Sequence, residues 1–159
     1  MITKLILGIF LAAAPLKTTT VKLAGGQVLN VEMATEPGEL NAGLMGRKSL
    51  SPDSGMLFVN NGIVRSKFYL FMYEWPVDIV WIDQDKTIVN MRENAAPCRN
   101  TTPNWRTECP GYDSIWMYTY ALHVPAGTIK RLKIRAGDVL SFDVPAPETA
   151  KKAGPGKRQ

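Results

Sequence analysis

The chain has 159 residues, of which 45% are hydrophobic and 21% charged; this length suits one domain, and this composition excludes an intrinsically disordered protein. The formal net charge of +5 would suit a nucleic-acid-binding domain only if the charge lay in the folded part. Without Lys4 and the basic stretch 148–159, however, residues 15–147 carry a net charge of only +1, which argues against nucleic acid as a partner.

Residues 1–17 predict a signal peptide. Lys4 precedes an unbroken apolar run from Leu5 to Ala14, and the small residues that end this run are typical of a cleavage site. The run is too short for a transmembrane span, which needs about 20 apolar residues. The alternatives are a strand of the domain or an uncleaved anchor, and Pro15 is unfavourable directly after a cleavage site. We therefore predict an exported protein, either periplasmic or extracellular.

Residues 18–145 predict one mostly β domain, a β-sandwich or barrel-like fold with two short helices. The strand-like runs are 21–23, 28–33, 55–59, 66–74, 77–82, 87–91, 115–124 and 139–144. One helix is expected over 35–46, with Pro37 in its first turn and Gly46 at its end, and the other over 125–134. Short strands with a turn signal about every ten residues favour this class, since a parallel α/β fold needs longer helices.

Residues 146–159 predict a disordered basic tail. The segment is rich in Pro, Gly and Lys and lacks large apolar side chains, so it cannot bury enough surface to offset the entropy lost on ordering. Four basic residues without aromatic neighbours would give only a weak contact with an anionic surface.

Cys98 and Cys109 are the two cysteines of the chain. In an exported protein an isolated pair predicts one disulfide. The alternatives are a metal site and a catalytic thiol. Structural zinc needs four ligands and His123 is the one histidine, while no neighbour in the sequence would lower a thiol pKa. We therefore predict a disulfide and neither a metal nor a cofactor.

Two further polar residues stand in strand-like segments. Asp78 interrupts the apolar run 75–82, so its carboxylate must be exposed, paired or functional. Arg47, which follows the expected helix, is a candidate partner, and we favour a structural salt bridge over a catalytic acid. His123 alternates within its strand and is expected to be a surface or pairing residue rather than a catalyst.

Seven short segments resemble one family in both content and order. They are 43–47, 55–59, 76–79 with 82–83, 93–98, 109–112, 124–128 and 136–138. Together they resemble the family called domain of unknown function 192, over about residues 28–144. The resemblance implies a single β-sandwich-like domain, commonly exported by bacteria, with no established activity. It also implies a candidate polar site made of Arg47, Asp78, Glu93 and Asn94, and pairs the two cysteines.

One departure from the family pattern affects the expected function. Where relatives usually have Lys-Asn-Thr, this chain has Phe71, Met72 and Tyr73. We expect these three residues to form an apolar contact patch. The change lowers the expectation of catalysis and raises that of an interaction role.

The first functional hypothesis is a non-catalytic binding or interaction domain at the cell envelope, with an unidentified protein or envelope ligand. One alternative is a structural or accessory component of an extracellular assembly such as a virion. The other is a hydrolase-like enzyme that uses Asp78, Glu93 and Arg47. The enzyme hypothesis requires these three side chains to converge on one cleft.

Overall fold

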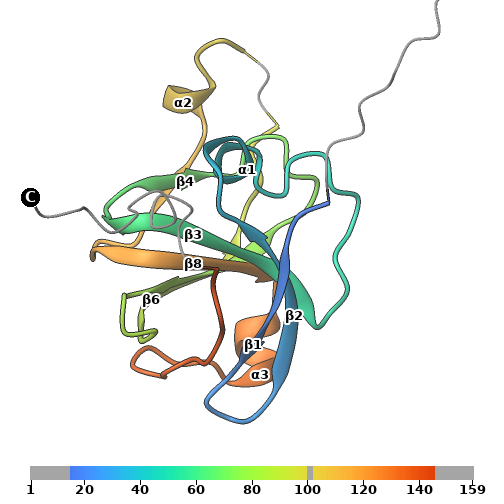
Figure 1. Ribbon diagram of the computed structural model, residues 1–159. Coiled ribbons are helices and arrows are strands. Elements are labelled where there is room, and N and C mark those ends of the chain that lie inside the picture. The colour runs from blue at the N-terminus through green and yellow to red at the C-terminus, as the bar shows by residue number, and fades with distance from the viewer. Residues whose placement is uncertain (1–14, 100–101, 146–159) are drawn as a thin grey trace, which may run out of the picture.

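The computed structural model describes residues 15–99 and 102–145 (Figure 1). It is mostly β, as predicted. The strands are β1 (Thr18–Lys22), β2 (Val28–Ala34), β3 (Ser54–Val64), β4 (Lys67–Tyr69), β5 (Val77–Ile82), β6 (Ile88–Ala95), β7 (Gly111–Asp113) and β8 (Tyr118–Pro125). The helices are α1 (Pro37–Ala42), α2 (Trp105–Glu108) and α3 (Thr128–Leu132). The apolar run of the expected signal peptide and the expected tail lie outside the described residues.

Six strands form the main sheet in the order β1-β2-β3-β8-β5-β6, and β4 pairs with β7 in a small second sheet. β2 and β3 are parallel, with Asn30 opposite Ser54, and the crossover between them carries α1. The other strand pairs are antiparallel. Within residues 15–99 and 102–145, no helix is long and apolar enough to cross a membrane.

The sheet is covered on both faces, which makes the fold sandwich-like. All six residues of β5 are buried, and its five apolar residues are divided between two apolar clusters. Val80 and Ile82 join a cluster that includes residues of β1, β2, α3 and the C-terminal segment. Ile79 and Trp81 join a second cluster, with residues from β3, β8 and the segment after β4. Strands buried on both faces are expected to be continuously apolar, and the sequence of β5 follows this rule except at Asp78.

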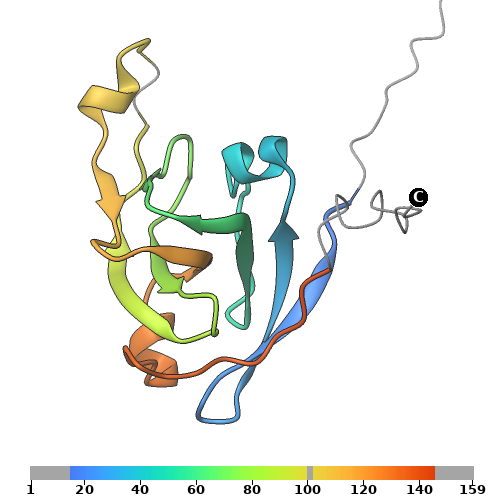
Figure 2. The ribbon, with the colours of Figure 1, turned by 60° about the vertical axis from the view of Figure 1, so that its left-hand side comes forward.

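The segment 137–143 connects the two edges of the main sheet. At the β6 edge, the Ile88 amide donates to the Asp138 carbonyl (2.9 Å). At the β1 edge, Lys22 and Ser141 exchange two backbone hydrogen bonds of 2.8 and 3.0 Å. Figure 2 shows this segment running from the α3 side to β1. The strand expected over 139–144 is therefore reduced to isolated bridges, because the segment crosses between two edges instead of following either.

Three further elements differ from the expectations. The strand expected over 66–74 ends at Tyr69, and the chain turns at Met72, whose φ is 54°. The apolar pattern of residues 66–74 comes from the burial of Leu70 and Tyr73 rather than from strand pairing. The short elements α2 and β7 were not predicted, because four and three residues are too few to show a period.

Candidate functional site

Asp78 is fully buried and has both carboxylate oxygens occupied by backbone donors. Oδ1 accepts a hydrogen bond from the Asn94 amide at 2.8 Å, and Oδ2 accepts one from the Ile129 amide at 2.9 Å. Ile129 lies in the first turn of α3, where the N-cap residue Gly127 has no side chain with which to cap the helix. The carboxylate from β5 therefore supplies the missing acceptor.

Asn94 and Glu93 lie opposite Asp78 in a bulge of β6. Val77 pairs with Ala95 but Ile79 pairs with Arg92, so β6 holds one residue more than β5 here. Asn94 takes a φ of 49°, which turns its amide toward the Asp78 carboxylate. The Glu93 side chain is 44% exposed and pairs with Lys130 of α3 at 3.4 Å.

The proposed salt bridge between Arg47 and Asp78 does not form. Arg47 pairs with Glu32 of β2 through both carboxylate oxygens, one of them at 3.2 Å. Its own carbonyl accepts a hydrogen bond from the Trp75 indole at 3.3 Å. Arg47 follows α1, whereas Asp78 caps α3, and these helices lie at opposite ends of the molecule (Figure 1). The structure thus brings Asp78, Glu93 and Asn94 together but leaves Arg47 apart, so the hydrolase hypothesis lacks its cleft.

The structure does not place Phe71, Met72 and Tyr73, the expected apolar contact patch, together at the surface. Tyr73 is only 5% exposed. Phe71 is half-buried and stacks on Trp105 of α2, with ring centroids 4.7 Å apart. Only Met72 is exposed, at 45%. Two of the three apolar residues therefore make intramolecular contacts, which accounts for the loss of polarity without a partner.

Cys98 and Cys109 form a disulfide, with Cα atoms 5.5 Å apart. The bond closes an arm that carries α2 and projects beyond the sheets (Figure 2). The arm is held at its base, where Cys98 exchanges backbone hydrogen bonds with Leu70 (2.9 Å) and Met72 (3.0 Å). The bond thus secures both the arm and the turn that buries Tyr73.

Replacing Cys98 and Cys109 together by Ser is expected to lower the free energy of unfolding by about 3 kcal/mol, the chain-entropy value for a loop of this length. Urea denaturation of oxidised wild type and the double variant measures it. Reduced wild type is the matched control and should unfold like the variant. Equal midpoints for the oxidised and reduced wild type would contradict the prediction.

His123 is completely buried in an aromatic cage, and not at the surface. Its ring lies 4.5 Å from that of Phe58 and 4.6 Å from that of Phe68. The Tyr73 hydroxyl accepts a hydrogen bond from the Leu44 amide (3.0 Å) and lies within hydrogen-bond distance of His123 Nδ1, at 3.2 Å.

Burial determines the protonation of this pair. It lowers the pKa of His123 to about 3 and raises the pKa of Tyr73 to about 12, so both are neutral at pH 7. His123 Nε2 finds no hydrogen-bond partner among the described residues. A neutral imidazole sealed from solvent holds the second apolar cluster together and is not placed to transfer protons to a substrate.

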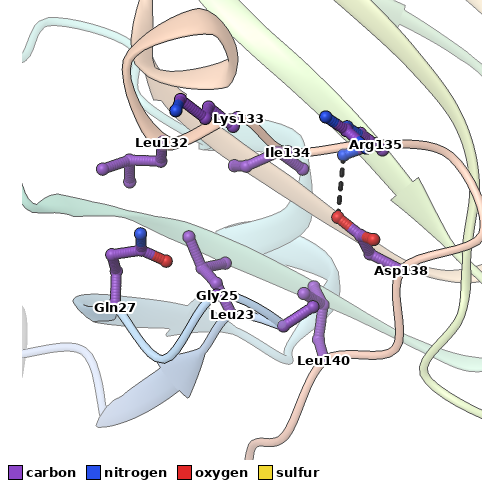
Figure 3. Close-up of a pocket in the computed structure, with 10 residues that line it drawn as sticks. Leu23, Gly25, Gln27, Leu132, Lys133, Ile134, Arg135, Asp138 and Leu140 are labelled. Atoms are coloured by element: carbon purple, nitrogen blue, oxygen red, sulfur yellow. Dashed lines mark hydrogen bonds between the residues drawn. The ribbon is translucent and has the colours of Figure 1, made fainter.

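A pocket of about 200 Å³ lies between the β1–β2 turn and the loop that follows α3 (Figure 3). Its apolar lining comes from Leu23, Leu132, Ile134 and Leu140. Its polar lining comes from Gln27, Lys133, Arg135 and Asp138. The Arg135 amide donates to Asp138 Oδ2 at 2.8 Å, which holds the loop in shape independently of the Arg135 side chain.

Sequence reasoning did not find this pocket. Its two walls come from segments more than 100 residues apart in the chain, and neither carries a recognisable motif. The helix expected over 125–134 gave the only signal, because it placed Leu132 and Lys133 near its end. Within residues 15–99 and 102–145, no cluster of His, Cys, Asp and Glu could hold a metal ion.

The chain is similar to two solved structures and to one family model. A crystal structure from Sinorhizobium meliloti 1021, whose description suggests a transcription regulator, is 31% identical, covers 82% of this chain and 98% of its own, and has a TM-score of 0.72. A protein of unknown function from Novosphingobium aromaticivorans DSM 12444 is 26% identical, covers 82% and 94%, and has a TM-score of 0.67. No curated protein matches the chain. The family model DUF192 (Uncharacterized ACR, COG1430) matches residues 19–142, and the chain belongs to this family.

Proposed function

We propose that this protein is an exported, non-catalytic binding domain of the cell envelope, and that its pocket receives a short apolar group with an anionic head. The observation that carries the proposal is the chemistry of the pocket, an apolar floor with two cations at the rim. Because ligand pockets usually measure about 300–1,000 Å³, a volume of about 200 Å³ favours a small ligand. A short-chain carboxylate meets both requirements.

The electrostatics of the rim support an anionic ligand. Lys133 and Arg135 are both exposed, and the ion pairs found among the described residues involve neither of them. Asp138, the one acidic residue of the lining, accepts a hydrogen bond from the Arg135 backbone amide. Two cations against one acid leave the rim with a net positive charge, and a carboxylate head would be attracted to it.

The placement of the polar residues supports binding rather than catalysis. Both oxygens of Asp78 are used by the backbone, His123 is sealed in its cage, and Arg47 pairs with Glu32. A general acid or base must reach its substrate, and none of these three groups does.

The envelope location rests on two independent features of the chain. The first is the signal-like pattern of residues 1–17. The second is the disulfide, a bond that persists in oxidising compartments. We do not carry the description of the Sinorhizobium protein as a regulator over to this chain. Its described helices have four to six residues, which is too short for a recognition helix in a DNA groove.

Titration of the ¹⁵N-labelled protein with hexanoate tests the proposal. We expect amide shifts concentrated at Leu23, Leu132 and Leu140, and none with hexylamine, the matched cation. Arg135→Gln should weaken hexanoate binding by up to about fivefold, because an exposed ion pair contributes about 0.2–1 kcal/mol. Lys48→Gln, a cation paired with Glu74 outside the pocket lining, is the control and should bind like wild type.

Equal responses to hexanoate and hexylamine, or no response to either, would refute the ligand class. Fractionation of cells that express the full chain tests the location. An exported protein with an N-terminus beyond residue 14 and no free thiols is expected. Cytoplasmic protein with two free thiols would refute export even if hexanoate binds.

A further inference from the structure

The loop between β7 and β8 presents three consecutive large apolar side chains to solvent. Ile115, Trp116 and Met117, here called the apolar tip, are 67%, 64% and 59% exposed. Single exposed apolar residues are normal on protein surfaces, but a contiguous group marks an interaction site. The tip contributes to neither apolar cluster, so the core does not account for it.

The tip stands on a base of polar contacts. Ser114, directly before it, is fully buried, and its carbonyl accepts a hydrogen bond from the Asn90 side chain of β6 at 2.6 Å. Ser114 Oγ donates to the Trp116 carbonyl, and the Ile115 amide donates to Asp113 Oδ1 at 3.0 Å. These contacts hold the three apolar side chains outward.

The backbone conformation of the tip is unfavourable for its sequence. Ile115 has a φ of 67°, a left-handed conformation that a β-branched residue rarely adopts and that Gly or Asn would adopt more easily. An exposed Ile here is favoured neither by the backbone nor by packing. Such strain is typical of a residue kept for an interaction.

Three basic residues lie on the segments next to the tip. Val64 pairs with Tyr118, so Arg65 and Met117 are the next residues along the two strands. Lys67 lies opposite Asp113 in the pairing of β4 with β7. The Arg92 guanidinium lies 5.6 Å from the ring of Tyr112, in the same strand as Asp113.

The three basic residues next to the tip are exposed and give this edge a net positive charge. Arg65, Lys67 and Arg92 are all exposed, and the ion pairs among described residues include none of them. Asp113 is the one acid among these neighbours, and its Oδ1 already accepts the Ile115 amide. In Figure 1 the β3–β4 turn and the start of β8 lie at the same edge of the molecule.

We infer that this edge docks on an anionic lipid surface, with the apolar tip inserted among the acyl chains and Arg65, Lys67 and Arg92 against the headgroups. Trp residues favour the boundary between headgroups and hydrocarbon. Apolar insertion together with basic residues supplies the two signals that stable peripheral binding requires. An exposed apolar tip with cations on the neighbouring segments complements a bilayer interface, and none of these residues lines the pocket.

Flotation of the full chain with vesicles tests the inference. Wild type should bind vesicles of phosphatidylcholine with phosphatidylglycerol, and bind them more tightly than pure phosphatidylcholine. Ile115→Asn and Trp116→Ser should each weaken binding about tenfold or more. Arg65→Gln should weaken binding to the anionic vesicles about fivefold and leave binding to phosphatidylcholine unchanged.

Val28→Ser removes another exposed apolar side chain, 47% exposed in β2, and should bind like wild type. All variants share the same N-terminal residues and tail, so differences among them report the tip and the basic residues next to it. A thermal scan separates loss of binding from misfolding. Ile115→Asn should unfold at a higher temperature than wild type, because Asn tolerates the left-handed conformation better than Ile. The same variant should bind vesicles more weakly, and a misfolded variant would not show both changes.

Vesicle binding that is unchanged in Ile115→Asn and Trp116→Ser overturns the inference. So does self-association of wild type that Trp116→Ser abolishes while vesicle binding persists, since the tip would then be a protein contact. Binding of wild type that is equal on both kinds of vesicle overturns the electrostatic part. The hexanoate titration is independent of the tip, so the pocket and the lipid surface can fail separately.

Discussion

Replacing Asp78 by Ala is expected to lower the free energy of unfolding by about 2–6 kcal/mol. The change leaves the buried amides of Asn94 and Ile129 without their acceptor, and each unsatisfied buried donor costs about 1–3 kcal/mol. It also removes the cap of α3 and the group that holds the β6 bulge. Urea denaturation followed by circular dichroism measures the loss.

Glu93→Gln is the matched control, because Glu93 lies in the same bulge but its side chain is 44% exposed. Its stability should stay within about 0.5 kcal/mol of wild type. Asp78→Asn keeps one acceptor oxygen and should fall between wild type and Ala, which gives a measurable variant even if Asp78→Ala does not fold. A wild-type midpoint for Asp78→Ala would show that the carboxylate is not structural.

The stability of the protein is expected to fall steeply as the pH drops from about 6.5 toward 3, by up to about 1.4 kcal/mol per pH unit through His123 alone. The pKa of His123 is lowered by burial from 6.5 to about 3. Between these two values the unfolded chain binds a proton that the folded chain excludes. The contribution is therefore present above pH 6.5 and is lost on acidification.

His123→Gln isolates this contribution, because Gln keeps a polar side chain beside the Tyr73 hydroxyl but does not titrate. Carboxylates titrate in both proteins and cancel in the comparison. Denaturation midpoints at several pH values should show the advantage of wild type over His123→Gln shrinking, or reversing, as the pH falls. Parallel pH profiles for the two proteins would contradict the prediction. Since His123 is the one histidine of the chain, its NMR signal can be followed without ambiguity.

The mostly β class, the family and the cysteine pair were predictable because each rests on local pattern or on composition. The partners of Asp78 were not. The apolar run around it indicated that the carboxylate must be satisfied, but the donors are backbone amides of Asn94 and Ile129. Every residue has such an amide, so no side-chain pattern can reveal which two will face the carboxylate.

Apolar residues misled sequence reasoning in both directions. Phe71 and Tyr73 were expected in a surface patch, but Phe71 stacks on Trp105 and Tyr73 contacts His123. Ile115 and its two neighbours looked like the start of a strand, yet β8 begins at Tyr118 and the three side chains are exposed. Hydrophobicity alone cannot separate these cases, because burial depends on which distant segment covers a residue.

The segment 137–143 bears on how the domain reaches its folded state. It bonds to Ile88 at one sheet edge and to Lys22 at the other, and it is among the last parts of the domain to leave the ribosome. The pairing of β3 with β8, residues about 60 positions apart, also waits for late synthesis, and such distant pairings fold slowly. The domain therefore cannot complete its main sheet until nearly all of it has been synthesised.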